Sequence, residues 1–340
     1  MRKEQIKSID FIKGMCALGV VMFHFEDHYT ARHLSFFSNY FNGGALVTVF
    51  FMVSGALLWH HYAQRLNLKE YAIKRWKGIY PMYYLAFLPC WLLKVWQEGS
   101  FLYGGSAFAY LYTLLGMDGY LVYNTNTYHI VGEWFLGAII LMYLLFPLIR
   151  WAFLKNKWVT VVGALMLYLV FYGKTITNAS PFWTVSSCLI SFCMGILFME
   201  YKSKIISLPG LLLAAMGYVL LNVVKIPLHA NAAYHLSGIC LFILLYALGE
   251  KTIVQPPLEK IFRALSRLSY PIFLVHHVIL RVILLFWQPE PLWQIGLLAL
   301  LTIGVVLLAS IVLALITKFV VTWFEKIWSK GIKTNYVLEK

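Results

Sequence analysis

The sequence predicts an all-α fold, a polytopic helical bundle of about ten transmembrane helices with both termini in the cytoplasm. Of its 340 residues, 61% are hydrophobic and only 12% are charged, whereas a soluble domain has about 25% charged residues. Apolar runs long enough to cross a bilayer recur along the whole chain, and most basic residues fall in alternate connections between them. Helices are expected because they satisfy their own backbone hydrogen bonds in lipid.

Ten candidate spans follow from windows of roughly 20 residues. They lie near residues 8–25, 43–60, 79–97, 133–153, 157–173, 183–200, 209–225, 234–250, 269–287 and 293–323. The sequence shows no internal repeat, no low-complexity segment and no linker to a second unit. We therefore expect residues 1–340 to form a single transmembrane domain, with no appended soluble domain.

The distribution of charge predicts the orientation of the spans. Basic residues precede the first span, fill the connection between the second and third, and end the chain. By the positive-inside rule these segments are cytoplasmic, and two cytoplasmic termini require an even number of spans. The formal net charge of +14 is then a topology signal. The expected partner is the lipid bilayer of the inner or plasma membrane, and not nucleic acid.

The cysteines do not predict a metal site. All five lie in apolar stretches, without a CxxC pair or a histidine at metal-ligand spacing. Such cysteines are usually small residues of the core. We expect no metal cofactor.

The first span carries two polar residues that suggest a reactive cavity. Lys13 and His24 are eleven residues apart, which is three helical turns plus about 20° and about 16 Å along the axis, so they share a face. Histidine suits general acid and base chemistry near neutral pH, and a buried lysine could hold a phosphate. Alternatively, Lys13 extends to the cytoplasmic headgroups and His24 is interfacial. Asp10 could pair with Lys13 or favour the start of the helix.

Two further stretches could contribute to the same cavity. Ser54 follows FFMV in the second span, and Ser54 with Gly55 would allow close helix packing. A basic run before the third span contains Lys74, Arg75 and Lys77. Such a run is ordinarily a topology marker, but it would also attract a cytoplasmic polyanion such as the nucleotide end of coenzyme A.

Two later predicted spans also carry histidines together with a charged residue. His129 and Glu133 precede the fourth predicted span, whereas His276 and Arg281 lie within the ninth. An arginine in a membrane span is more often functional or paired than incidental. His277 follows His276, and the sequence does not decide which of the two faces inward.

The longest external connection, near residues 98–132, is rich in tyrosine. Aromatic rings at this depth are usually interfacial belt residues, although a platform for sugar rings is an alternative. The residues are Tyr103, Tyr110, Tyr112, Tyr120, Tyr123 and Tyr128.

These stretches together resemble the acyltransferase family 3 membrane proteins, an O-acetyltransferase-like family of bacterial surface polysaccharide modification. Lys13 and His24 match the family's basic residue, ten-residue spacer and histidine, with Asp10 at its preceding aspartate. The other similar segments are FFMVSG at 50–55, the basic run 74–81, WFL to proline at 134–147 and the S-Y…H element at 269–276. Lysine replaces the more common arginine at 13, which keeps the charge but loses bidentate phosphate geometry.

The resemblance implies an O-acyltransferase, and most simply an O-acetyltransferase. Its donor would be cytoplasmic acetyl-CoA or another acyl-CoA, held near Lys13, Lys74, Arg75 and Lys77. Its acceptor would be a carbohydrate hydroxyl in the cell envelope, deprotonated by His24 as general base or acylated through His24 as a transient carrier. Ser54, His276 and Arg281 are candidate donors to the thioester oxyanion.

Two alternatives stay open from the sequence. One is a transporter or flippase for a polysaccharide or lipid-linked sugar, although no paired halves with interrupted helices are visible. The other is a structural partner in a polysaccharide synthase complex, in which Lys13 and His24 would be replaceable. A homodimer is also compatible with the sequence.

Overall fold

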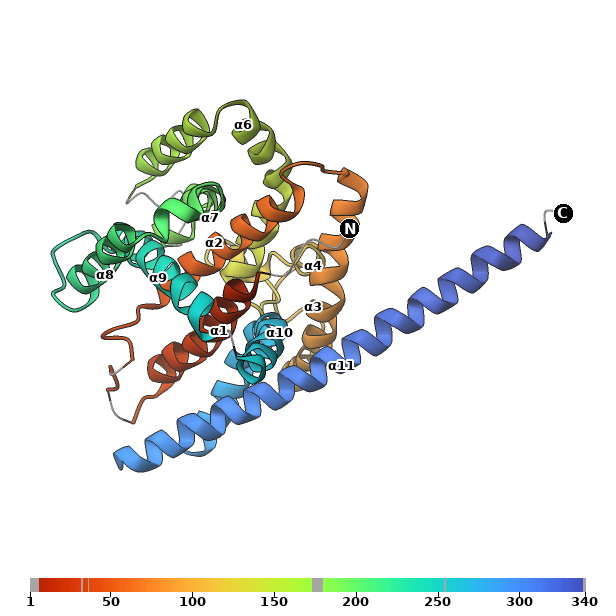
Figure 1. Cartoon of the computed structure of the whole chain (residues 1–340). Coiled ribbons are helices and arrows are strands. Elements are labelled where there is room, and N and C mark those ends of the chain that lie inside the picture. Colours follow the sequence, from red (N-terminus) through yellow and green to blue (C-terminus); the bar gives the residue numbers. More distant parts are fainter. Residues whose placement is uncertain (1–5, 32, 36, 173–179, 254, 339–340) are drawn as a thin grey trace.

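The computed structural model describes residues 6–31, 33–35, 37–172, 180–253 and 255–338, with side chains as far as residue 327. All regular elements in these ranges are helical, as predicted (Figure 1). The long helices are α1 (Lys7–His28), α2 (Gly43–Tyr62), α3 (Leu68–Glu98), α6 (Trp134–Val170), α7 (Val185–Ile205), α8 (Leu208–Asn222), α9 (Ala230–Thr252), α10 (Pro256–Phe286) and α11 (Leu292–Leu338). Four short elements, η1 (Ala107–Ala109), α4 (Tyr110–Leu114), α5 (Asp118–Leu121) and η2 (Pro181–Trp183), lie in two connections.

Seven helices in the described ranges are long and apolar enough to cross a membrane: α1, α2, α6, α7, α9, α10 and the part Leu292–Ile327 of α11. The chain is therefore a multi-pass membrane protein. The orientation of the termini and the count of ten stay predictions, because α3 is not among the seven, α8 has only 15 residues, and two predicted spans fall within α6.

The boundary predicted inside α6 coincides with a break in its backbone. Asn156 has extended dihedral angles, φ −158° and ψ 102°, between two helical segments. Its side-chain oxygen accepts hydrogen bonds from the backbone N–H groups of Trp158 and Val159, both at 3.1 Å. Asn156 thus caps the second segment in the way that asparagine commonly does. The predicted span 157–173 begins at this cap, and its residue 173 lies outside the described residues.

Helix α1 lies in the middle of the bundle, between α2 and α9 on one side and α10 and α11 on the other (Figure 1). Ile12 and Cys16 pack into the cluster shared with α2 and α9. Ala17 and Val21 pack into the cluster shared with α10 and α11. Two faces of α1 are therefore packed against neighbouring helices, which leaves its polar side chains to face an internal space or the helix ends.

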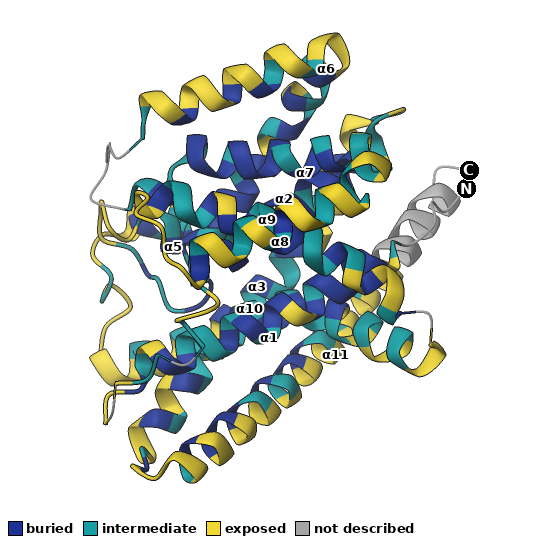
Figure 2. Cartoon of the chain, turned by 60° about the vertical axis from the view of Figure 1, so that its left-hand side comes forward, coloured by how far each residue is buried: buried dark blue, intermediate teal, exposed yellow. Residues whose placement is uncertain are grey.

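The outer faces of the bundle are exposed (Figure 2), and many of the exposed residues are large and apolar. Leu144, Leu285, Leu300 and Phe319 are between 69% and 79% exposed. Large apolar side chains in such numbers at a soluble surface would promote aggregation. In a bilayer they contact lipid chains, which agrees with the membrane assignment.

Helices α2 and α7 approach each other through glycine. A Cβ atom on Gly55 would lie 2.1 Å from the backbone oxygen of Phe192, and one on Gly195 would lie 2.0 Å from that of Met52. Neither backbone can yield without separating the helices. The small residue predicted at Gly55 therefore allows close helix packing, as in other membrane bundles.

We expect Gly55→Ala to destabilise the bundle by about 1–3 kcal/mol, the usual cost of overpacking. The measurement is the thermal unfolding midpoint of the detergent-solubilised protein. Gly163→Ala in α6 is the matched control, because a Cβ atom there meets nothing within 4 Å. Equal midpoints for the two variants would contradict the close packing of α2 and α7.

Candidate functional site

A cavity of about 770 Å³ lies inside the bundle, lined from α1, α2, α3, α6, α9 and α10 and from the connections before α2, α6 and α7. This volume is typical of small-molecule and cofactor sites. Lys13 and His24 both line the cavity. The face shared by these two residues, predicted from their spacing, is thus the face that α1 turns to the cavity.

Lys13 and Arg75 of α3 both line the cavity away from His24 and Glu133, because Lys13 lies eleven residues before His24 on α1 and Arg75 lies over Tyr143, ten residues after Glu133 on α6. We call this part of the cavity its basic end. The Arg75 guanidinium lies over two tyrosine rings, 5.4 Å from the centroid of Tyr143 and 5.8 Å from that of Tyr71. Asp10 is near enough to Lys13 to interact with it electrostatically. Asp10 also accepts a hydrogen bond of 2.6 Å from the Ser266 hydroxyl, which ties α1 to α10.

The residues of the predicted basic run lie partly at the cavity and partly at the surface. Lys74 is exposed and does not line the cavity. Lys77 forms an exposed ion pair with Glu325 of α11, with 2.7 Å between Nζ and the carboxylate. Ser54 does line the cavity, and its hydroxyl lies 3.5 Å from that of Tyr143. The structure therefore brings Arg75 and Ser54 to the cavity, and leaves Lys74 and Lys77 outside it.

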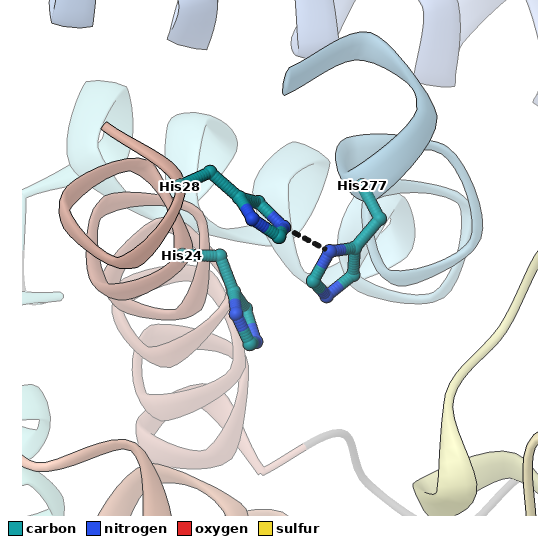
Figure 3. Close-up of side chains that lie close together, drawn as sticks. All are labelled: His24, His28 and His277. Atoms are coloured by element: carbon teal, nitrogen blue, oxygen red, sulfur yellow. Dashed lines mark hydrogen bonds between the residues drawn. The ribbon is translucent and has the colours of Figure 1, made fainter. Parts of the chain in front are cut away.

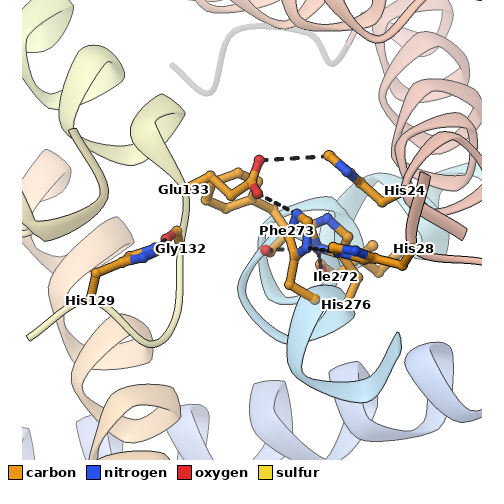
Figure 4. Close-up of polar contacts among 9 residues, drawn as sticks. His24, His28, His129, Gly132, Glu133, Ile272, Phe273 and His276 are labelled. Carbon is orange, nitrogen blue, oxygen red and sulfur yellow. Dashed lines mark hydrogen bonds and ion pairs between the residues drawn. The ribbon is translucent and has the colours of Figure 1, made fainter. Parts of the chain in front are cut away.

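The other end of the cavity contains a cluster of histidines around one carboxylate (Figure 4). Glu133 Oε2 lies 3.7 Å from His24 Nε2, and Oε1 contacts His277 Nε2. His277 Nδ1 in turn lies 2.9 Å from His28 Nε2 (Figure 3). An imidazole and an anionic partner that could orient it are thus adjacent.

Glu133 is positioned by the start of α6 and by the connection before it. It is the N-cap residue of α6, where the helix dipole favours a negative charge. The preceding residue, Gly132, has a left-handed backbone with φ 69°, which glycine adopts without strain. A Cβ atom on Gly119 of α5 would lie only 2.6 Å from the Glu133 carbonyl carbon. The backbone of α5 therefore directly supports Glu133.

His129 also supports this turn and does not line the cavity. Its Nε2–H donates a hydrogen bond of 2.5 Å to the Gly132 carbonyl. Burial lowers the pKa of His129, so the ring is neutral at pH 7. We interpret His129 as a structural residue of the connection.

Asp118 is a second acid in this connection, and it is buried. It is 2% exposed, and the Tyr83 hydroxyl donates to its Oδ2 at 3.4 Å. Burial raises its pKa from 3.8 to about 6. A carboxyl whose pKa is higher in the folded state binds its proton more tightly there, so its stabilising contribution is present below pH 4 and is lost as pH rises to 6.

We expect the thermal midpoint of the wild type, relative to Asp118→Asn, to fall between pH 4 and pH 6.5. The difference should correspond to about 1–3 kcal/mol, the linkage value of a shift of this size. The amide cannot ionise, so it removes this one titration at nearly constant shape. A difference that is the same at both pH values would show that Asp118 titrates normally.

The two adjacent histidines of α10 point to different places. His277 lines the cavity, whereas His276 is 0% exposed and does not. His276 Nδ1–H donates to the carbonyl oxygens of Ile272 and Phe273, at 3.0 and 2.9 Å. Arg281, one turn further along α10, also lines the cavity.

Aromatic side chains line the cavity near the histidines. Trp183 lies between Tyr123, at 4.7 Å between ring centroids, and Trp134, at 5.2 Å and an interplanar angle of 18°. All three line the cavity. In contrast, Tyr110 and Tyr128 stack on each other at 3.9 Å. Of the six tyrosines predicted as a belt or a sugar platform, Tyr123 is the one that lines the cavity.

Comparison with protein families identifies the chain. The family model of the acyltransferase domain matches residues 6–318. The chain belongs to acyltransferase family 3. Membership supports membrane acyltransferase activity in general. Searches of curated proteins and of solved structures found no match.

Three residues of this family 3 acyltransferase were not among the predicted site residues: His28, Glu133 and His277. A carboxylate at the start of an apolar span is a sequence signal that could have included Glu133. His28 lies four residues after His24 on α1, so helical periodicity could have placed it on the same face. The contact of His28 with His277 spans 249 residues of sequence and has no local signal.

Proposed function

We propose that the protein is an O-acyltransferase of a bacterial inner or plasma membrane. It transfers an acyl group, most simply acetyl, from cytoplasmic acyl-CoA to a hydroxyl of a cell-surface or extracellular carbohydrate. One observation carries the proposal: a single cavity in a family 3 acyltransferase has Lys13 and Arg75 at one end and His24 beside Glu133 at the other.

The basic end suits the phosphates of acyl-CoA. Lys13 supplies a point charge, and Arg75 supplies a planar fork that fits phosphate oxygens. Connections rich in lysine and arginine lie at the same end of α1, which the positive-inside rule assigns to the cytoplasm. His24 is about 16 Å further along the axis of α1. The extended pantetheine arm of coenzyme A carries its thioester away from the phosphates, in the direction of His24.

His24 serves as the general base in this mechanism. The Glu133 carboxylate, 3.7 Å from Nε2, favours the tautomer with its proton on Nε2. Nδ1 is buried and has no hydrogen-bond partner in the described part of the chain, so it is left to accept a proton after a rotation of the ring toward the bound acceptor. The acceptor hydroxyl loses its proton to His24 while its oxygen attacks the thioester carbonyl. Collapse of the tetrahedral intermediate breaks the carbon–sulfur bond, and the coenzyme A thiolate takes the proton back from His24. Glu133 stabilises the imidazolium that forms between these two steps.

The developing oxyanion requires hydrogen-bond donors. Ser54 and Arg281 line the cavity and are candidates for this role. His276 is a weaker candidate, because its Nδ1–H already donates to two backbone carbonyls. The aromatic rings of Tyr123, Trp134 and Trp183 provide flat apolar surfaces near the histidines that suit the acceptor sugar.

The test is transfer of labelled acetyl from acetyl-CoA in membranes from cells that make the protein. We expect release of coenzyme A thiol and entry of label into alkali-labile carbohydrate ester. Membranes without the protein are the control. Absence of transfer from acetyl-CoA and from longer acyl donors, with an acceptor extract from the same cells, would overturn the proposal and favour transport.

Arg75 gives a sharper test of the donor end. We expect Arg75→Gln to raise the KM for acyl-CoA by about tenfold with little change in kcat, because a contact to the nonreacting phosphates contributes uniform binding. Lys74→Gln removes the same charge from the neighbouring position, which is exposed and outside the cavity, and should leave KM within about twofold. Equal effects of the two substitutions would show that only net charge matters.

A further inference from the structure

The histidine cluster contains more imidazoles than the proposed reaction uses. The mechanism assigns a base to His24 and an anionic partner to Glu133, and His277 holds that carboxylate from the other side. His28 has no part in it. Nevertheless, one ring nitrogen of each of His24, His28 and His277 lies within 4.8 Å of those of the other two (Figure 3).

We propose that His24, His28 and His277 form a binding site for a divalent transition metal ion, most simply Zn²⁺, and that the bound ion inhibits transfer by occupying His24. The inhibition rests on the proposed function, whereas metal binding does not. The ion is a reversible ligand that competes with the reaction.

The arrangement on the two helices fits a chelating site. His24 and His28 are four residues apart on α1, so they project from one face one turn apart, which is the spacing with which a helix presents two imidazoles to zinc. His277 approaches from α10, with its ring centroid 4.1 Å from that of His24 and 5.1 Å from that of His28. Zinc–nitrogen bonds are about 2.0–2.1 Å long. Rotations of the three side chains that move each nitrogen by about 1 Å would place all three at bonding distance from one ion.

Glu133 fits the second shell of such a site. A histidine that binds a metal through one ring nitrogen usually donates its other N–H to a carboxylate, which fixes the ring. His277 has this arrangement: Nδ1 faces His28 at 2.9 Å, and Nε2 contacts Glu133. The fourth ligand of a tetrahedral ion would be water or Glu133 itself.

The local charge also favours a cation. Asp27 and Glu133 are both near enough to His28 to act on it electrostatically, and the positive charge of Arg281 opposes them. All of these residues line the cavity. The cavity would admit an ion without movement of a helix. Three neutral imidazoles prefer zinc, copper, nickel or cobalt to magnesium or calcium.

Direct binding is tested with Co²⁺, whose visible absorption reports nitrogen ligands, followed by displacement with Zn²⁺. The sample is the full-length protein in detergent, stripped with a chelator. We expect one equivalent to bind to the wild type and to His33→Gln, which replaces an exposed histidine of the connection after α1. His28→Gln and His277→Gln should each bind at least tenfold more weakly. No Co²⁺ spectrum with the wild type, or unchanged binding by both cluster variants, would overturn the site.

Inhibition is tested by the transfer assay at increasing free Zn²⁺, with each variant compared with its own metal-free rate. With substrates below their KM, wild type and His33→Gln should share one half-inhibitory concentration that is close to the Zn²⁺ dissociation constant, and His28→Gln should raise it at least tenfold. Full transfer by the wild type at saturating Zn²⁺ would overturn the inhibition while leaving the site established. A protein that binds Co²⁺ but never transfers an acyl group would instead contradict the proposed function.

Discussion

His24→Gln is expected to lower acyl transfer by about 10²–10⁴-fold, the usual contribution of a positioned general base. Glutamine keeps a polar side chain of similar length but cannot accept the proton of the acceptor hydroxyl at neutral pH. His24 is only partly buried, with 18% of its side chain exposed, so the variant should fold. The measurement is label transferred from acetyl-CoA in membranes that contain equal amounts of each protein.

His33→Gln is the matched control for this experiment, because it makes the same substitution in an exposed residue. It should retain wild-type transfer. Full activity of a folded His24→Gln protein would refute both roles considered for His24, the general base and the acyl carrier. Loss of the thermal transition in His24→Gln would assign the defect to folding.

The features predicted correctly from the sequence depend on local periodicity and composition. The helical fold follows from the apolar runs, because only helices can satisfy their backbone within single spans in lipid. Lys13 and His24 face one cavity because eleven residues are close to a whole number of helical turns. The break at Asn156 coincides with the short polar stretch between two predicted spans. Family membership is likewise confirmed over residues 6–318.

Other features of the site depend on how helices are rotated against distant neighbours. The basic run gives no reason to distinguish Lys74, Arg75 and Lys77. The rotation of α3 turns Arg75 toward the cavity and brings Lys77 to Glu325, 248 residues away in the sequence. His276 and His277 are separated by 100° on α10. The packing of α10 against α1, α11 and α3 decides that His277 faces the cavity.

Glu133 shows why a residue can be noted in the sequence without its partner or its role being identified. It stands at the start of an apolar span, where an acid also has the ordinary role of favouring a helix N-terminus. Its contact with His24 of α1 depends on the connection between α3 and α6, in which Gly132 has a left-handed backbone and Gly119 lies against the Glu133 backbone. The sequence of either helix alone carries no sign of this contact.

Glu133→Gln should reduce kcat by about 10–10²-fold and leave the KM for acyl-CoA within about twofold. Partners that orient a functional imidazole contribute effects of this size, and a loss in kcat alone marks an interaction made in the transition state. The neutral amide keeps the shape of the side chain but cannot stabilise the imidazolium of His24. It can also present its NH₂ group to Nε2, which would favour the opposite tautomer.

Glu290→Gln is the control, because this carboxylate is exposed just beyond the end of α10. Glu133→Asp tests whether the negative charge alone is sufficient, because it keeps the anion but shortens the side chain. The carboxylate is already 3.7 Å from His24 Nε2 in the wild type, so aspartate would lie further away. We therefore expect Glu133→Asp to lie between the wild type and Glu133→Gln. Glutamine at wild-type rates would mean that His24 acts without its anionic neighbour, and Glu133 would then serve only to hold His277 against α1.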